Sequence, residues 1–142
     1  MEKIRDLKGE REWLEAFQVM KQLRLHLDEE EFLALVKLAE EKEEYQISVL
    51  EADHEIVCVI GYMPMITLYY GRYLWVCDLV TDSKHRSKGY GEKLLNCIEE
   101  RARKKGFDGI ALSSAFQRIE AHRFYEEKMG FDKVSYSFKK GF

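Results

Sequence analysis

The stretch that decides the fold lies just past the middle of the chain and runs Leu79-Val80-Thr81-Asp82-Ser83-Lys84-His85-Arg86-Ser87-Lys88-Gly89-Tyr90-Gly91-Glu92-Lys93-Leu94-Leu95. An apolar, β-branched segment leads into a polar loop, and two glycines then open a segment with apolar residues at helical spacing. The free N–H groups and the dipole at the start of a helix bind phosphate, and glycine lets the backbone approach the anion closely. The stretch therefore predicts a strand, a phosphate-binding loop and a helix, in that order.

The spacing of the glycines separates this loop from two common nucleotide-binding motifs. The ATP-binding pattern GxxxxGK[ST] is absent, and Leu94 stands where a dinucleotide-binding motif needs its third glycine. What remains after the strand is R-x-x-G-x-G, from Arg86 to Gly91. This pattern resembles the acetyl-CoA motif, Q/R-x-x-G-x-G/A, of the GNAT family of N-acetyltransferases.

A second segment, one helix and one strand further along, strengthens the resemblance. It runs Glu120-Ala121-His122-Arg123-Phe124-Tyr125-Glu126-Glu127-Lys128-Met129-Gly130-Phe131. It is similar to the family's helix that carries Phe-Tyr-Glu and is followed by Gly-Phe. The likeness is dense over residues 73–138 and looser over residues 1–72, where only the order of the elements and a hairpin agree.

The resemblance implies an α/β (mixed α+β) fold, a GNAT-like twisted mixed β-sheet flanked by helices. Two central parallel strands would splay apart, the first of them at 73–81, and acetyl-CoA would lie between them as the co-substrate. The backbone of Leu79, Val80 and Thr81 would pair with the pantetheine arm like an added strand. The residues that would wrap the pyrophosphate are Arg86, Ser87, Lys88, Gly89, Tyr90, Gly91 and Glu92.

Two side chains are the candidates for catalysis. Tyr125 matches the family tyrosine whose hydroxyl lies near the cofactor sulfur, and a proton from it would help the thiolate to leave. The alternative is a core tyrosine beside Phe124. Many members carry a glutamate base on the central strand, but the matching positions here are Trp75 and Cys77. Asp78 is the nearest carboxylate, and it is either a base or substrate anchor, or a structural hydrogen-bond acceptor.

A further departure from the family lies before the second motif. Arg118 stands where the family often has asparagine, and it would either reach a phosphate of CoA or lie on the surface. The sequence shows no spacing typical of a Ser/His/Asp or Cys/His nucleophile. This absence is consistent with direct attack of an amine on acetyl-CoA in a ternary complex, and we expect no metal.

Periodicity places the remaining elements on both sides of this region. In chain order the expected elements are a strand near 4–7, helices near 10–25 and from 28, strands near 47–49 and 56–60 joined by a turn at 52–54, a strand at 73–81, a helix from 89 to 106, a strand at 110–112, a helix at 120–128 and a last strand at 134–138. A capping box is expected at Asp28 and Glu31. Pro64 points to an edge or a bulge.

Composition sets the broad class. The chain has 142 residues, 46% of them hydrophobic and 35% charged. We expect a single domain over 1–142, because no linker is visible. The longest apolar run has five residues, too short for a membrane span. The chain has three cysteines, Cys58, Cys77 and Cys97, and this odd number favours reduced packing thiols. Because no secretory segment is visible, we expect a cytoplasmic location.

Charge is distributed unevenly along the chain. Residues 1–60 hold 8 Lys/Arg and 16 Asp/Glu, a balance of −8, whereas residues 61–142 have a balance of +5. This asymmetry favours an anionic ligand on the C-terminal part and a cationic amine acceptor, small molecule or peptide, on the N-terminal part. The alternative is a soluble surface whose asymmetry is accidental. Nucleic acid is disfavoured, a homodimer stays open, and a non-catalytic acyl-CoA-binding or regulatory module is the alternative to an enzyme.

Overall fold

The computed structural model describes residues 1–142 and contains two compact units, residues 1–111 and 112–142. The elements are β1 (Glu2–Leu7), α1 (Gly9–Met20), α2 (Glu29–Glu43), β2 (Gln46–Ala52), β3 (Glu55–Thr67), β4 (Gly71–Thr81), the 3₁₀ turn η1 (Ser83–His85), α3 (Tyr90–Lys104), β5 (Gly109–Leu112), α4 (Ile119–Arg123) and the π-helical turn η2 (Phe124–Lys128). The alternation of helices and strands confirms the predicted α/β fold. No helix combines the length and the apolarity that a membrane crossing requires.

The strands form one sheet in the order β1-β2-β3-β4-β5. The pairs β1–β2, β2–β3 and β3–β4 are antiparallel, and α3 connects β4 to its neighbour β5. The predicted turn at 52–54 is confirmed, with Asp53 and His54 both at positive φ. Pro64 lies in β3 beyond Tyr62, the last β3 residue paired with β2, so it stands at an edge as expected.

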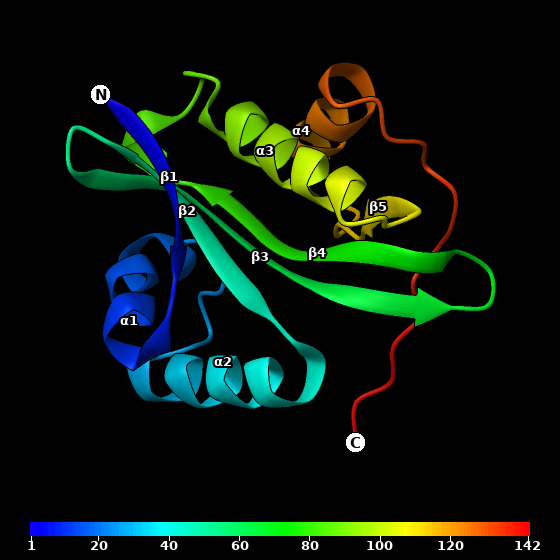
Figure 1. The fold of residues 1–142 in the computed structure, drawn as a ribbon, viewed down its shortest axis with the longest axis horizontal. Coiled ribbons are helices and arrows are strands. Elements are labelled where there is room, and N and C mark those ends of the chain that lie inside the picture. Colours follow the sequence, from blue (N-terminus) through cyan, green and yellow to red (C-terminus); the bar gives the residue numbers. More distant parts are fainter. The chain divides into compact units, whose positions relative to one another are not determined.

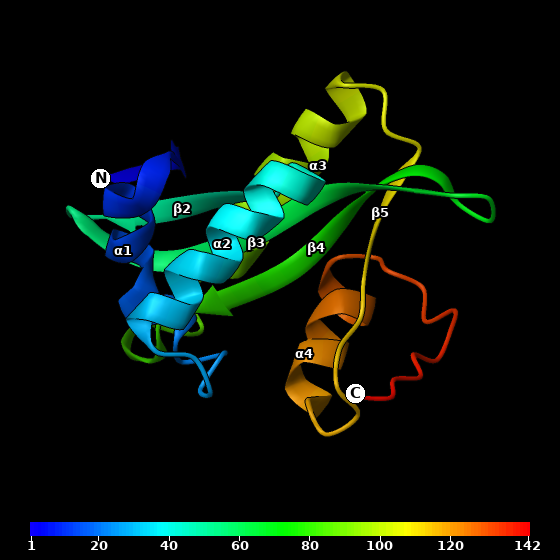
Figure 2. The ribbon, with the colours of Figure 1, turned by 90° about the horizontal axis from the view of Figure 1, so that it is seen from below.

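Helices cover the two faces of the sheet in the first unit. Figure 1 shows α1 and α2 on one face and α3 on the other, and the rotated view in Figure 2 agrees. Alternate β2 residues, Ile47 and Val49, are fully buried in the core that contains Trp13 and Phe17 of α1. Leu94, Leu95 and Ile98 make the buried stripe of α3, as the sequence predicted. The period of two along the strands thus supplies both layers of the core.

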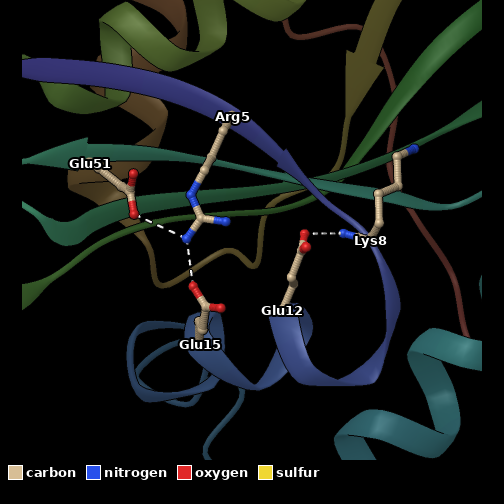
Figure 3. Close-up of polar contacts among 5 residues, drawn as sticks. All are labelled: Arg5, Lys8, Glu12, Glu15 and Glu51. Carbon is tan, nitrogen blue, oxygen red and sulfur yellow. Dashed lines mark hydrogen bonds and ion pairs between the residues drawn. The ribbon is translucent and has the colours of Figure 1, made fainter.

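Ionic contacts fasten α1 to the edge of the sheet (Figure 3). The Arg5 guanidinium on β1 donates to Glu15 of α1 and to Glu51 of β2. The hydrogen bond to Glu51 is 3.0 Å long. The hydrogen bond from Arg5 holds the pKa of Glu51 below its ordinary value. Glu12 accepts the backbone N–H of Lys8 at 2.7 Å, which satisfies a donor at the start of α1.

The helix α2 begins at the capping box that the sequence predicted. The carboxylate of Asp28 accepts the N–H of Glu31 at 2.8 Å, and the Glu31 side chain accepts the N–H of Asp28 at 3.3 Å. The loop between α1 and α2 therefore has a defined end. This matters for the site, because Arg24 of that loop reaches β4 and Gln22 reaches Asp82 and Ser83 just beyond it.

A β-bulge in β4 changes which face its side chains point to. Gly61 pairs with Asp78 but Tyr62 pairs with Val76, so Cys77 is the extra residue. Leu74 lies on the face of α3, whereas Asp78 and Val80, also even-numbered, lie on the face of α1 and α2. One inserted residue reverses the alternation of a strand. The bulge thus turns Asp78 toward the α1–α2 loop.

The C-terminal segment departs from the sequence-based expectation. The predicted strand at 134–138 is wrong: the residues after Met129 form no regular element, and Val134, Tyr136 and Phe138 are exposed. Alternating apolar residues form a strand only where a neighbouring strand supplies hydrogen-bond partners, and this segment pairs with none. The first helix is also shorter than predicted and ends at Met20. The helix expected at 120–128 is formed by α4 and η2 together.

The packing at the bulge yields a stability prediction for Gly61→Ala. A Cβ at Gly61 would stand 1.9 Å from the Tyr45 hydroxyl and 2.7 Å from a carboxylate oxygen of Asp78. We expect a loss of about 1–3 kcal/mol in the free energy of unfolding, measured with urea, because the side chains of Tyr45 and Asp78 leave no space for a methyl group at this position. The matched control is Gly141→Ala, whose Cβ meets nothing within 4 Å. Equal stability of the two variants would contradict the prediction.

Candidate active site

The N-terminus of α3 presents backbone donors that nothing in the protein satisfies. Gly89 is the N-cap residue, at φ 80° and ψ 12°, and has no side chain to cap the helix. The first N–H bonded along the helix is that of Lys93, to the Gly89 carbonyl at 3.1 Å. The N–H groups of Tyr90, Gly91 and Glu92 therefore lack partners. Three such donors at the positive end of a helix dipole form a site suited to an anion.

The loop before Gly89 adds positive charge. Arg86, Ser87 and Lys88 are exposed, and Ser87 adopts a positive φ of 64°, which is uncommon for a residue with a side chain. Arg86 and Lys88 form no ion pair. Lys93, by contrast, donates to Glu2 of β1 at 2.6 Å. The charge available to an anion on this loop thus comes from Arg86 and Lys88, and from Lys84 in η1, which is also exposed and forms no ion pair.

Gln22, which follows α1, holds the start of the loop. Its amide nitrogen donates to the Asp82 carboxylate at 2.7 Å, and its amide oxygen accepts the N–H of Ser83 at 2.9 Å. Asp82 is buried, and its own N–H donates to Val57 of β3 at 2.8 Å. The sequence analysis missed Gln22, because nothing local marks a contact between residues 60 positions apart.

His85 lies partly buried in the same loop. Its side chain is only 22% exposed, and Nε2 lies 3.5 Å from Glu55 and 3.7 Å from Asp82. The 3₁₀ turn η1 folds the imidazole back toward the end of β4. His85 thus helps to fix the loop that precedes the helix.

The final residues of β4 have an open edge on the side of β5. Asp108, just before β5, donates its N–H to the Arg72 carbonyl at 2.7 Å, so β5 starts beside the beginning of β4. The four residues of β5 cover roughly 13 Å, whereas Leu79 lies roughly 23 Å along β4 from Arg72. No strand therefore lies next to Leu79, Val80 and Thr81 on that side. A ligand with amide groups could pair there as an added strand.

Both carboxylate oxygens of Asp78 accept hydrogen bonds. Arg24 donates to one at 2.8 Å and the Tyr45 hydroxyl to the other at 2.6 Å. The Asp78 side chain is 13% exposed. Burial, and then the Asp78 charge, raises the pKa of Tyr45 well above its ordinary value, so the phenol stays protonated and donates.

Arg24 also stabilises the β-bulge. A second guanidinium nitrogen donates to the Cys77 carbonyl at 2.8 Å. Cys77 is the residue left out of the ladder, so its carbonyl benefits from a partner outside the sheet. Arg24, which the sequence analysis did not single out, thus joins the α1–α2 loop to the part of β4 just before Leu79.

The other predicted residues lie in the second unit. Tyr125 is buried in η2, with its ring centroid 5.3 Å from that of Phe124 and 5.7 Å from that of Phe131. Arg118 is half-buried and precedes α4 as its N-cap residue, without a side-chain cap bond. The proposed roles of Tyr125 and Arg118 toward acetyl-CoA stay predictions.

The thiols near the sheet are held in the protonated form. Burial raises the pKa of Cys58 to about 11, and burial followed by the Asp78 charge raises the pKa of Cys77 to about 12. A nucleophilic cysteine needs a lowered pKa instead. The site therefore offers no cysteine nucleophile at Cys58 or Cys77.

Comparisons with known proteins agree on one family. The acetyltransferase (GNAT) family model matches residues 10–131. YhdJ of Bacillus subtilis, described as an uncharacterized N-acetyltransferase, is 40% identical over 137 residues, which are 96% of each chain. A transcriptional regulator from Bacillus halodurans shares the fold with a TM-score of 0.83 at 24% identity, over 100% of both chains. The aminoglycoside N-acetyltransferase AAC(6')-Iy, solved with CoA, has a TM-score of 0.85 at 12% identity, over 99% of this chain and 94% of its own.

The raised thiol pKa values predict slow alkylation. With a pKa of about 12, Cys77 should react with iodoacetamide at pH 8 about a thousandfold more slowly than a free cysteine, because only the thiolate attacks. Mass spectrometry of peptides after timed labelling measures the rate. In guanidinium all three cysteines should react at similar rates, which is the control. Labelling of native Cys77 at the rate of a free thiol would show that the prediction is wrong.

Proposed function

This chain belongs to the GNAT family of acetyltransferases, and we propose that it transfers the acetyl group of acetyl-CoA to a primary amine in a ternary complex. One observation carries the proposal: a single loop joins the open edge at the end of β4 to the uncapped N-terminus of α3. The two features suit the two parts of one cofactor, an amide-containing arm and a pyrophosphate.

The residues present fit acetyl-CoA, which the family uses. The free N–H groups of Tyr90, Gly91 and Glu92, with the charges of Arg86 and Lys88, would hold the pyrophosphate. The backbone of residues 79–81 would pair with the pantetheine arm. Arg118 would contribute a further contact to a phosphate. When bound, acetyl-CoA supplies an acetyl group activated as a thioester.

Proton transfers define what the protein must add. The bond from the amine nitrogen to the acetyl carbon forms and the carbon–sulfur bond breaks. The amine loses a proton to solvent water, and the departing thiolate gains one from the protein. We assign the proton given to sulfur to the hydroxyl of Tyr125, in agreement with its place in the second motif. A strand N–H such as that of Val80 would stabilise the charge that develops on the carbonyl oxygen.

Asp78 is the proposed partner of the incoming amine. It immediately precedes Leu79, and its side chain faces the α1–α2 loop because of the bulge. Both oxygens already accept hydrogen bonds, so Asp78 is better suited to hold an ammonium by electrostatic attraction than to take up its proton. The −8 balance of residues 1–60 would draw a cationic acceptor to this side.

The cofactor assignment predicts the effect of Gly89→Val. A β-branched side chain at φ 80° strains the N-cap and stands where the backbone must approach phosphate. We expect CoA to bind at least about tenfold more weakly by isothermal titration calorimetry. Gly106→Val at the other end of α3 is the matched control, because Gly106 also has a positive φ, 82°, and open space around it. Unchanged CoA affinity in a folded Gly89→Val protein would refute the assignment.

The catalytic assignment predicts the effect of Tyr125→Phe, which removes a proton donor and little volume. We expect kcat to fall by about 10²–10⁴-fold with nearly unchanged affinity for acetyl-CoA, because the hydroxyl acts on charge that develops in the transition state. Release of free thiol with the best amine of a panel gives kcat, and Tyr69→Phe, at an exposed tyrosine, is the control. If Tyr125 is only a packing residue, kcat stays within twofold of the parent value.

A further inference from the structure

A cavity of about 360 Å³ lies between α2, the end of α1 and β4, beside Asp78. Its volume is within the range of small-molecule sites, roughly 300–1,000 Å³. All of its lining residues belong to the first unit. Because Asp78 immediately precedes Leu79, the cavity adjoins the strand segment that the proposed function assigns to the pantetheine arm.

Most of the cavity wall is apolar. The apolar lining comes mainly from α2 and the turn before it, and consists of Leu27, Phe32, Leu35, Val36, Ala39 and, from α1, Met20. Leu35 is 52% exposed although it lines the cavity, so its side chain is available to a ligand. A wall of this kind gains free energy by covering an aliphatic or aromatic group.

The polar wall is small and close to electrically neutral. Its charged or titratable members are Arg24, His26, Tyr45 and Asp78. Asp78 is the single carboxylate, and Arg24 pairs with it at 2.8 Å while Tyr45 donates at 2.6 Å. The Asp78 charge is balanced by Arg24, so the carboxylate can accept a hydrogen bond from one ammonium group but the lining has no excess negative charge. Two or more further ammonium groups would find no carboxylate in the lining and would lose hydration without compensation.

We propose that this cavity binds the acceptor, and that the acceptor is a primary amine with a single positive charge on an apolar body. The proposal rests on the proposed acetyl transfer to an amine and narrows its acceptor class. The amine nitrogen would lie toward Asp78 and the apolar body against α2. Polyamines and aminoglycosides, which carry several ammonium groups, fit this lining poorly.

A panel of acceptors tests the class. Phenethylamine, ethylamine, spermidine and sisomicin are compared by kcat/KM with acetyl-CoA and a free-thiol readout. Phenethylamine should exceed ethylamine by tenfold or more, because even one additional methylene in an apolar pocket changes kcat/KM by roughly 10–200-fold. It should also exceed spermidine and sisomicin. A higher kcat/KM for either polycation would overturn the inference and leave acetyl transfer to an amine standing.

A pair of variants tests whether the apolar body of the acceptor lies in the cavity. Leu35→Gln and Leu38→Gln change leucines with the same 52% exposure on the same helix, but only Leu35 lines the cavity. Leu35→Gln should lower kcat/KM for phenethylamine about tenfold, mainly through KM, with little change for ethylamine. Leu38→Gln should leave both amines unchanged. Equal effects of the two variants would overturn the inference.

A binding measurement separates this inference from the proposed function. Phenethylamine is titrated by calorimetry into the protein saturated with CoA. Binding that Leu35→Gln weakens and Leu38→Gln does not supports the cavity as the amine site, even if no amine is acetylated and the proposed function fails. Absence of binding, or binding that neither variant changes, overturns the inference whatever the turnover results are.

Discussion

The hydrogen bond from Tyr45 to Asp78 is the contact around which the first unit is arranged. It forms across Gly61, where a methyl group would occupy the position of the hydroxyl. It requires Asp78 to face the α1–α2 side, and the bulge at Cys77 provides that orientation. Arg24 completes the arrangement by bonding both to the Asp78 carboxylate and to the carbonyl of the bulge residue. Three segments far apart in the sequence therefore meet at one carboxylate.

The same short region of β4 serves both proposed substrates. The bulge at Cys77 interrupts the β3–β4 ladder just before Asp78, and β5 is too short to cover the other edge of the strand beyond it. The backbone edge would be available to acetyl-CoA, while the side chain of Asp78 would face the acceptor. Gln22 fixes the direction in which the chain leaves the strand, so that the loop arrives at Gly89 with the helix donors uncovered. Rigid support of this kind is what a binding loop on a scaffold requires.

Fold and acceptor choice are separate matters in this architecture. The chain superposes on AAC(6')-Iy, an aminoglycoside N-acetyltransferase, with a TM-score of 0.85 although only 12% of residues are identical. Likeness at that level concerns the backbone, whereas substrate choice depends on the side chains that line the cavity. Here the lining has one carboxylate, already paired with Arg24, and a largely apolar wall from α2. The chemistry of this lining is the reason to expect an amine with an apolar body.

The sequence by itself determined the elements whose signals are local. Gly89 and Gly91 marked the start of α3, and Asp28 and Glu31 marked the start of α2. Alternation marked β2 and a continuous apolar run marked β3, because caps and local patterns depend on residues close in the sequence. The two motifs also determined the family. Tertiary structure alone decided the setting of Asp78, because a bulge depends on the partner strand and the donors Arg24 and Tyr45 lie 54 and 33 positions away. It also decided that residues 134–138 form no strand. Alternating apolar residues give a segment one apolar face, but a strand also needs a neighbouring strand for its backbone hydrogen bonds.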